Sequence, residues 1–218
     1  MAQRLEGKKI AILATHGFEQ SELTDPKKLL EGWGATTRVV SPAKEGSIKG
    51  WKEKDWGDEV TVDQPLADAN PDDFDALLLP GGQMNPDTLR IDASALAFIE
   101  AFGKAGKPVA AICHGPWLLI DTGLAKGRQV TSWPSVRRDL ENAGAQWRDE
   151  EAVVDGTLIT SRNPDATPAP SEPLKRAHEP CRPRVAPSHA RRHPNRRRKP
   201  ARINCPTTRP APSCRDPG

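Results

Sequence analysis

The sequence VAAICHGPW, residues 109–117, places a cysteine at the end of a short apolar run and directly before His-Gly-Pro. The run is typical of a buried strand, and His-Gly-Pro predicts a sharp turn into the apolar helical stretch Trp117 to Leu124. A turn from a strand directly into a helix places the side chain of the turn residue above the edge of the sheet. The N-terminus of the following helix favours the thiolate form of a cysteine at that position. Cys113 occupies this turn position. It is either a nucleophile or redox centre, or a buried cysteine that packs as a small apolar residue.

Strands and helices alternate on both sides of this stretch. Strands are predicted at residues 8–14, 36–40, 75–79 and 108–112, and shorter ones near 130, 146–148, 152–154 and 157–160. Helices are predicted at residues 21–33, 93–105 and 135–143, and residues 42–60 read as an extended loop or hairpin. The alternation favours an α/β fold with a parallel sheet covered on both faces.

Three chemically marked segments follow strands of this predicted sheet. His16 to Glu22 follow the first strand, Gly81 and Gly82 follow the third, and Cys113 and His114 follow the fourth. Ligands bind beyond the carboxyl ends of the strands in such sheets. The three segments therefore predict one site on one rim.

Glu19 and Glu22 lie three residues apart and share one face of the first predicted helix. Acidic residues suit a helix N-terminus without any further role. Both also lie on the rim that carries Cys113, and a carboxyl group pressed against a cysteine should have a raised pKa.

Each of the remaining rim residues has either a structural or a functional role. His114 is either a structural hydrogen-bonding residue or a base that a carboxylate must orient, and neighbouring side chains at a tight turn diverge. Gly81 and Gly82 either form a plain turn or let the backbone approach a ligand. In the second case the N–H groups of Gly82 and His114 form an oxyanion hole.

The charge of the 218-residue chain is divided between two regions. Residues 166–218 hold 11 Arg and 2 Lys against 3 acidic residues, whereas residues 1–165 are acidic overall. Twelve of the last 53 residues are proline and no apolar period remains, so a disordered tail is expected after a domain at 1–165. Cys113 is the only cysteine of residues 1–165, and the first residues lack a signal peptide, so a reducing cytoplasm is expected.

Other ligand classes have weak support. No dinucleotide fingerprint, phosphate loop or zinc spacing occurs, so neither a metal nor a cofactor is expected. No apolar stretch is long enough to span a membrane. The run Arg196 to Lys199 lacks stacking aromatic residues, so it allows non-specific polyanion binding and no specific nucleic-acid recognition.

Several segments together resemble the PfpI family of intracellular cysteine peptidases and protein deglycases, in the class I glutamine amidotransferase-like superfamily. The segments are GFEQSEL, FDALLLPGGQMNPDTLR, GKPVAAICHGPWLL, TSW and NAGAQWRDEEAVVDGTLITSRNPD, between about Lys8 and Asp165. The resemblance implies a flavodoxin-like three-layer sandwich. After Asp165 the family's final helix is missing, and a shifted reading frame near codon 166 would explain both the loss and the tail.

The resemblance also implies roles for single residues. Cys113 is the expected nucleophile, Glu22 its carboxyl partner, and His114 the catalytic histidine. Asp87 falls where relatives carry an acid that reaches the histidine from a neighbouring subunit, which implies a homodimer or higher oligomer. Glu19 is a second acid beside the pocket, and Trp133 falls where an aromatic residue lines it.

Three functions remain open at this point. The favoured one is a cofactor-free, cysteine-dependent stress enzyme that acts on small aldehydes, such as glyoxal and methylglyoxal, or on their adducts with proteins and amino acids. The second is an ATP-independent peptidase. The third is a redox-sensing, chaperone-like protein in which Cys113 is oxidised.

Overall fold

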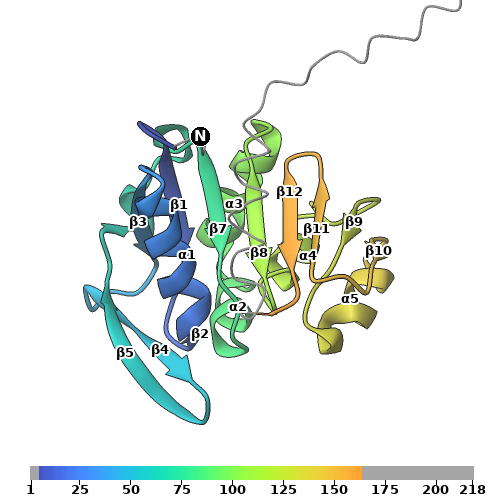
Figure 1. Ribbon diagram of the computed structural model, residues 1–218, viewed down its shortest axis with the longest axis horizontal. Helices are drawn as coiled ribbons and strands as arrows, with labels where there is room; N and C mark the ends of the chain where they lie inside the picture. The colour runs from blue at the N-terminus through green and yellow to red at the C-terminus, as the bar shows by residue number, and fades with distance from the viewer. Residues whose placement is uncertain (1–4, 164–218) are drawn as a thin grey trace, which may run out of the picture. The chain divides into compact units, whose positions relative to one another are not determined.

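The apolar runs become the strands of a seven-stranded sheet in the computed structural model, which describes residues 5–163 (Figure 1). The strand order is β11-β12-β8-β7-β1-β3-β6, and every pairing is parallel except that of β11 with β12. The strands are β1 (Lys9–Leu13), β3 (Thr36–Ser41), β6 (Gln64–Pro65), β7 (Ala76–Leu79), β8 (Val109–Ile112), β11 (Ala152–Asp155) and β12 (Leu158–Ser161). The expected parallel sheet is confirmed.

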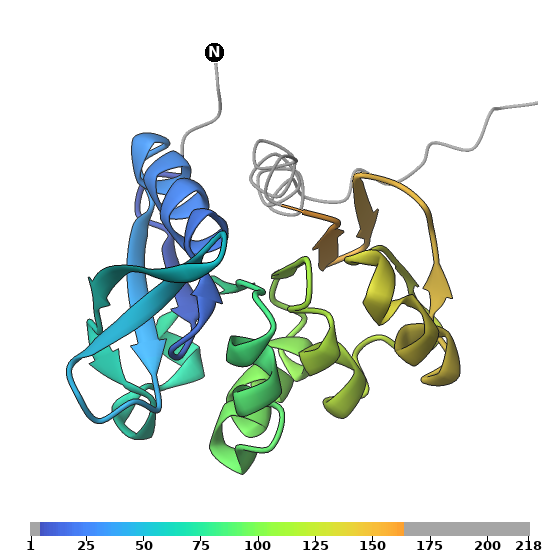
Figure 2. The same ribbon diagram turned by 90° about the horizontal axis from the view of Figure 1, so that it is seen from below.

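Helices cover both faces of this sheet. They are α1 (Gln20–Gly32), α2 (Met84–Leu89), α3 (Ala93–Lys104), α4 (Trp117–Asp121) and α5 (Arg137–Asn142), with 3₁₀ turns η1 (Leu66–Asp68), η2 (Pro71–Asp73) and η3 (Pro134–Val136). In Figure 2, α1 lies on one side of the sheet and the green helices α2, α3 and α4 on the other. Side chains alternate along β1, so Ile10 and Ile12 join one core while Ala11 and Leu13 join the other. The fold is the expected flavodoxin-like three-layer sandwich.

Two smaller sheets flank the main one. The first contains β2 (Phe18–Glu19), β4 (Ser47–Lys52) and β5 (Asp55–Thr61), and the second contains β9 (Gln129–Val130) and β10 (Gln146–Trp147). The β4–β5 hairpin projects past the carboxyl ends of the main strands (Figure 1). Residues 42–60, expected as a loop or hairpin, therefore contain a hairpin.

Some element boundaries differ from the sequence-based expectation. The helix after the Cys113 turn ends at Asp121 and not at Leu124, because Gly123 adopts a positive φ of 71°. The helix expected at residues 135–143 starts as the 3₁₀ turn η3 and continues as α5. The six-residue helix α2 was not expected, since it is too short to show a helical period.

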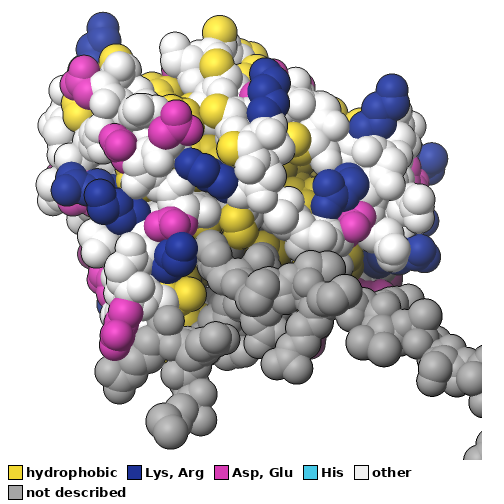
Figure 3. All heavy atoms as spheres, turned by 90° about the horizontal axis from the view of Figure 1, so that it is seen from above, with side chains coloured by type: hydrophobic (Ala, Val, Ile, Leu, Met, Phe, Trp, Pro, Cys, Tyr) yellow, Lys and Arg dark blue, Asp and Glu magenta, His cyan; other side chains and the backbone are white. Residues whose placement is uncertain are grey.

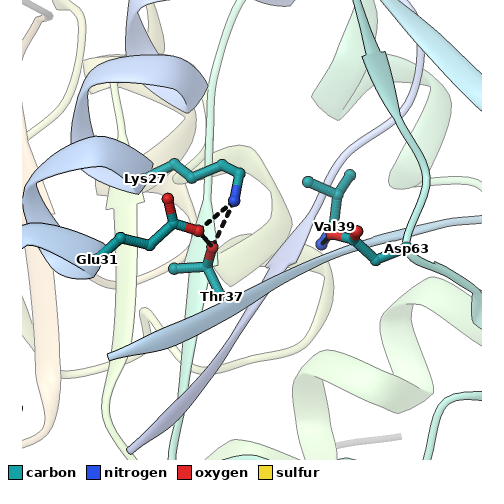
Figure 4. A network of polar contacts seen from close by, with 5 residues as sticks. All are labelled: Lys27, Glu31, Thr37, Val39 and Asp63. Carbon is teal, nitrogen blue, oxygen red and sulfur yellow. Dashed lines mark hydrogen bonds and ion pairs between the residues drawn. The ribbon is translucent and has the colours of Figure 1, made fainter. Parts of the chain in front are cut away.

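A polar network joins α1 to β3 (Figure 4). Lys27 donates to Thr37 Oγ1 at 2.8 Å, and both side chains also bond to Glu31. Nearby, Asp63 Oδ2 accepts from the Val39 backbone N–H at 2.7 Å, and the Asp63 N–H donates to the Val39 carbonyl at 2.9 Å. The two bonds of Asp63 satisfy the backbone N–H and carbonyl of Val39 in β3, because the neighbouring strand β6 has only two residues and pairs with Val40 and Ser41.

None of the helices within residues 5–163 is long and apolar enough to cross a membrane. The proline- and arginine-rich segment expected from Ala166 lies outside the described residues. The shifted reading frame and the missing final helix therefore stay predictions, which sequencing of the locus around codon 166 would test.

Candidate active site

The three rim segments lie side by side, because β8, β7 and β1 are neighbours in the sheet. Asn85 of α2 holds two of these segments together. Its Oδ1 accepts from the Thr15 N–H at 2.7 Å, and its Nδ2 donates to the carbonyls of Pro80 and Gly81 at 2.8 and 3.3 Å. Asn85 is fully buried, so these bonds fix the rim without competition from water.

Cys113 occupies a strained turn between β8 and α4. Its φ of 58° is in the left-handed region, which costs a non-glycine residue roughly 1–2 kcal/mol. The turn is held by the Cys113 N–H, which donates to the Ser161 carbonyl at 2.8 Å, and by the Gly115 N–H, which donates to the Ile112 carbonyl at 2.7 Å. A Cβ on Gly115 would lie 2.6 Å from the Leu79 carbonyl oxygen, so this turn requires glycine.

Glu22 reaches Cys113 from the first turn of α1. The carboxyl group is buried, and its Oε2 accepts from the Gly81 N–H at 2.7 Å. Its Oε1 has no hydrogen-bond partner. Burial raises the pKa of Glu22 from 4.5 to about 8, although the hydrogen bonds from Gly81 and Cys113 oppose the rise. At neutral pH Glu22 is therefore mostly a protonated acid, as expected for a carboxyl group beside a cysteine.

From the sequence, the helix N-terminus was expected to favour the Cys113 thiolate. This expectation is wrong, because the effects that raise the pKa of the thiol outweigh the effect of the backbone N–H that lowers it. Burial raises the pKa of the Cys113 thiol most, and a charged Glu22 raises it further. The backbone N–H of His114 lowers it, but α4 has only five residues. A protonated Glu22 therefore favours the thiolate more than a charged Glu22 does.

His114 folds back onto the cysteine that precedes it. Its Nδ1 lies 3.2 Å from Cys113 Sγ, and its Nε2 lies 3.3 Å from Ser135 Oγ. The ring packs against both Trp117 and Trp133, with centroid distances of 5.1 and 6.3 Å. Burial lowers the pKa of His114 from 6.5, so the imidazole is neutral at pH 7. A tautomer with the proton on Nε2 donates to Ser135 and leaves Nδ1 free to accept the thiol proton.

These groups open onto a cavity of about 530 Å³. The residues that line it are Gly17, Glu19, Glu22, Trp51, Glu53, Gly82, Gln83, Met84, Cys113, His114 and Trp133. Of the site residues expected from sequence, Cys113, His114, Glu22, Gly82, Glu19 and Trp133 are brought together here. Gly81 and Asp87 are not part of the lining.

The last two residues have other positions. Gly81 is buried beneath the cavity, where a Cβ would meet Glu22 Oε2 at 2.7 Å and the His114 nitrogen at 2.8 Å. Its role in this structure is to bond Glu22 and to let the rim segments approach. Asp87 is exposed on α2.

Sequence reasoning did not name five of the lining residues, Gly17, Trp51, Glu53, Gln83 and Met84, or Ser135, which contacts His114. Trp51 and Glu53 come from the β4–β5 hairpin, and Ser135 comes from η3. The paired tryptophans in GWKEKDW, residues 50–56, could have indicated a hairpin, but nothing local connects Ser135 with His114. Among the described residues, no group of three or more His, Cys, Asp or Glu side chains is arranged to hold a metal ion.

Comparison with known proteins gives the family of the chain. A model described as the DJ-1/PfpI family matches residues 8–172 of the chain. The chain belongs to the DJ-1/PfpI family. Within it, "General stress protein 18" of Bacillus subtilis is 48% identical over 164 residues, which cover 75% of this chain and 93% of that protein. "Putative cysteine protease YraA" of the same organism is 44% identical over 158 residues, which cover 72% and 90%.

Solved structures of DJ-1/PfpI proteins share the fold. A two-domain protein of Anabaena variabilis, with DJ-1/ThiJ/PfpI-like and ferritin-like domains, gives a TM-score of 0.72 at 35% identity and covers 77% of this chain and 47% of that one. DJ-1 of Schizosaccharomyces pombe gives 0.69 at 23% identity and covers 79% and 93%. The second likeness concerns the fold alone.

Proposed function

We propose that this DJ-1/PfpI protein is a cofactor-free hydrolase that acts on glyoxal and methylglyoxal adducts, with Cys113 as the nucleophile. The observation that carries the proposal is the contact of one sulfur with a buried acid and a neutral imidazole at the floor of a cavity. A nucleophile and a base within hydrogen-bond reach are the minimum for covalent catalysis. A cavity of about 530 Å³ suits a small carbonyl compound or the end of a modified side chain.

The chemistry can be written with balanced atoms. The Cys113 thiol adds to the aldehyde carbon of methylglyoxal, His114 takes the thiol proton, and Glu22 gives a proton to the aldehyde oxygen. His114 then passes the thiol proton on to Glu22, so that the imidazole is again a free base. In the resulting hemithioacetal, His114 takes the proton from the first carbon while the ketone oxygen gains a proton, which gives an enediol. His114 then gives its proton to the second carbon while the hydroxyl group on the first carbon loses its proton, which leaves a lactoyl thioester. Water cleaves the thioester, so that lactate leaves and the thiol is restored.

An amine adduct enters the same sequence by one further step. The sulfur displaces the amine from the carbon that bears the hydroxyl group, a C–S bond forms as the C–N bond breaks, and the amine leaves with a proton from Glu22. The N–H groups of Gly82 and His114 are the proposed donors to the oxygen that develops charge. In this proposal Asp87 acts across the interface of a homo-oligomer, and the reducing cytoplasm keeps Cys113 as a free thiol.

The test is lactate release from methylglyoxal by the full chain. Cys113→Ser should lose turnover, whereas Cys205→Ser, which changes a cysteine outside the described residues, should keep it. Turnover retained by Cys113→Ser would refute the proposal.

A peptidase is the second candidate, because the relative YraA carries the words "cysteine protease" in its name. The same sulfur would then attack a peptide carbonyl. Cleavage of an unfolded protein by the pure enzyme, without ATP and without lactate release from methylglyoxal, would favour this candidate over the first.

A further inference from the structure

The β4–β5 hairpin is fastened to the segment that carries Glu19. Strand β2 pairs in parallel with β4, so that Phe18 is opposite Gly50 and Glu19 is opposite Trp51. A Cβ on Gly50 would lie 3.2 Å from the Phe18 ring, so the two strands are in close contact. The hairpin is therefore a fixed wall of the cavity.

The Trp51 side chain of this wall is held in place, and Glu53 lies beside it at the turn of the hairpin. The Trp51 ring packs edge-on against Trp56 at 5.6 Å, and its Nε1 donates to the Glu53 carbonyl at 3.2 Å. Glu53 itself has a φ of 56°, in the left-handed region, at the turn of the hairpin. Trp51 and Glu53 both line the cavity that contains Cys113.

The charged side chains that line the cavity, among the residues that the structure describes, are the carboxylates of Glu19 and Glu53. Glu22 also lines it but is mostly protonated at neutral pH, and no Lys or Arg of residues 5–163 is part of the lining. The pKa of Glu19 is raised by its burial and also by the charge of Glu53, so these two carboxylates interact through space. Lys28 and Lys52 lie in a neighbouring depression that shares Glu19 and Glu53 with the cavity. By contrast, acidic and basic side chains are interspersed at the amino ends of the strands (Figure 3).

The aromatic side chains that line the cavity also favour a positively charged group. Trp51 and Trp133 line the cavity, and 41% of the Trp133 surface is exposed. The face of an indole attracts ammonium and guanidinium groups within about 6 Å of its centre.

Inside the site, Glu22 Oε1 is buried without a hydrogen-bond partner.

We infer that this cavity selects substrates that carry a positive charge next to the reacting carbon, with Glu53 and Trp51 as specificity-determining residues. An ammonium or guanidinium group would lie between the two tryptophans and near Glu19 and Glu53. This deepens the proposed function and rests on it: adducts of lysine- or arginine-like side chains are preferred over adducts of thiols, which carry no such charge.

The test uses the reactivity of Cys113 and needs no turnover. A methanethiosulfonate transfers its thioalkyl group to the thiolate, so that an S–S bond forms and methanesulfinate leaves. The reagents are 2-(trimethylammonio)ethyl and 2-sulfonatoethyl methanethiosulfonate, each normalised to its rate with 2-mercaptoethanol. Labelling is followed at the Cys113 peptide by mass spectrometry, which separates it from the cysteines at 181, 205 and 214.

The cationic reagent should label wild-type Cys113 about five-fold faster or more after normalisation. Glu53→Gln should reduce this ratio about two- to five-fold, in line with one partly screened surface charge. The matched control is Glu59→Gln, since Glu59 is exposed on the same hairpin, accepts from Ser47 Oγ at 3.2 Å and does not line the cavity. Glu59→Gln should leave the ratio unchanged.

A normalised wild-type ratio of one or less, or a ratio that Glu53→Gln leaves unchanged, would overturn the inference. Neutral methyl methanethiosulfonate reports whether the variant keeps an intact thiol site. If Glu53→Gln does not fold, the normalised labelling ratio of the wild-type protein is measured at about 1 M salt instead. Screening by salt should bring this ratio toward one, and a ratio that stays constant would contradict the inference. Failure of the proposed reaction is separate, since it would appear as lactate release by Cys113→Ser with the labelling ratio intact.

Discussion

The imidazole of His114 lies against the sulfur of Cys113, its immediate neighbour in the chain, with Nδ1 3.2 Å from Sγ. Successive side chains at an ordinary turn diverge, and the left-handed φ of 58° at Cys113 removes that divergence. The strained turn therefore makes a cysteine–histidine pair from two consecutive residues, with Glu22 contacting the cysteine from a different element.

Stability should fall as the pH rises, because of Glu22. Its pKa is about 8 in the folded protein against 4.5 as the ordinary value, so the folded state holds a proton that the unfolded state releases. This contribution is complete below pH 4.5 and is lost as the pH rises through about 8, on the order of 5 kcal/mol in all. Urea unfolding between pH 5 and 9 measures it. Glu22→Gln should flatten the profile, and equal slopes in both proteins would contradict the assignment.

The activity should depend on pH in a bell-shaped manner. Above the Glu22 pKa of about 8 the carboxylate opposes the thiolate and has no proton to give, so kcat/KM declines. On the acid side His114 becomes protonated only below its ordinary 6.5, because burial lowers its pKa. Initial rates with methylglyoxal from pH 5 to 9.5 check both limbs. A rate that keeps rising above pH 9 would exclude protonated Glu22 as the required form.

Ser135 is expected to act as a positioning residue through its contact with His114 Nε2 at 3.3 Å. Ser135→Ala removes a hydrogen bond, so kcat/KM should fall about two- to twelve-fold. The acid limb should move to lower pH, since the imidazolium loses an acceptor, and Ser135→Thr should restore both values. Loss of rate with an unmoved acid limb would indicate a merely structural effect.

Asn85 should be critical for folding of the rim. Asn85→Ala leaves the Thr15 N–H and the Pro80 carbonyl without their buried partner, which should cost roughly 2–5 kcal/mol of unfolding free energy. Thermal and chemical denaturation measure the loss. The exposed Asn142 at the end of α5 offers a control, because Asn142→Ala should change stability by less than about 0.5 kcal/mol.

The sequence allowed most of the sheet and its rim to be predicted, because buried parallel strands are continuous apolar runs and their carboxyl ends meet at one edge. The hairpin wall was not predictable in this way. Strand β5 is mostly exposed, so it shows no clear apolar alternation, yet its hairpin supplies Trp51 and Glu53. Ser135 meets His114 only through tertiary packing.

The balance of charges at Cys113 was also beyond the sequence. A turn near a helix N-terminus suggested a thiolate, but burial and the proximity of Glu22 depend on how α1 docks on the sheet. The three-residue spacing of Glu19 and Glu22 predicted a shared helix face, but Glu19 belongs to β2 and α1 starts at Gln20. Both residues line the cavity, and only the packing of α1 determines that Glu22 is buried while Glu19 is half-buried.

The most direct measurement is rapid-quench mass spectrometry of the Cys113 peptide during the first turnover with methylglyoxal. The proposed mechanism predicts a three-carbon adduct on Cys113 that forms before lactate and decays as lactate appears, and that is missing in Cys113→Ser. Lactate formation with no adduct on Cys113, or with an adduct there that never decays, would contradict it.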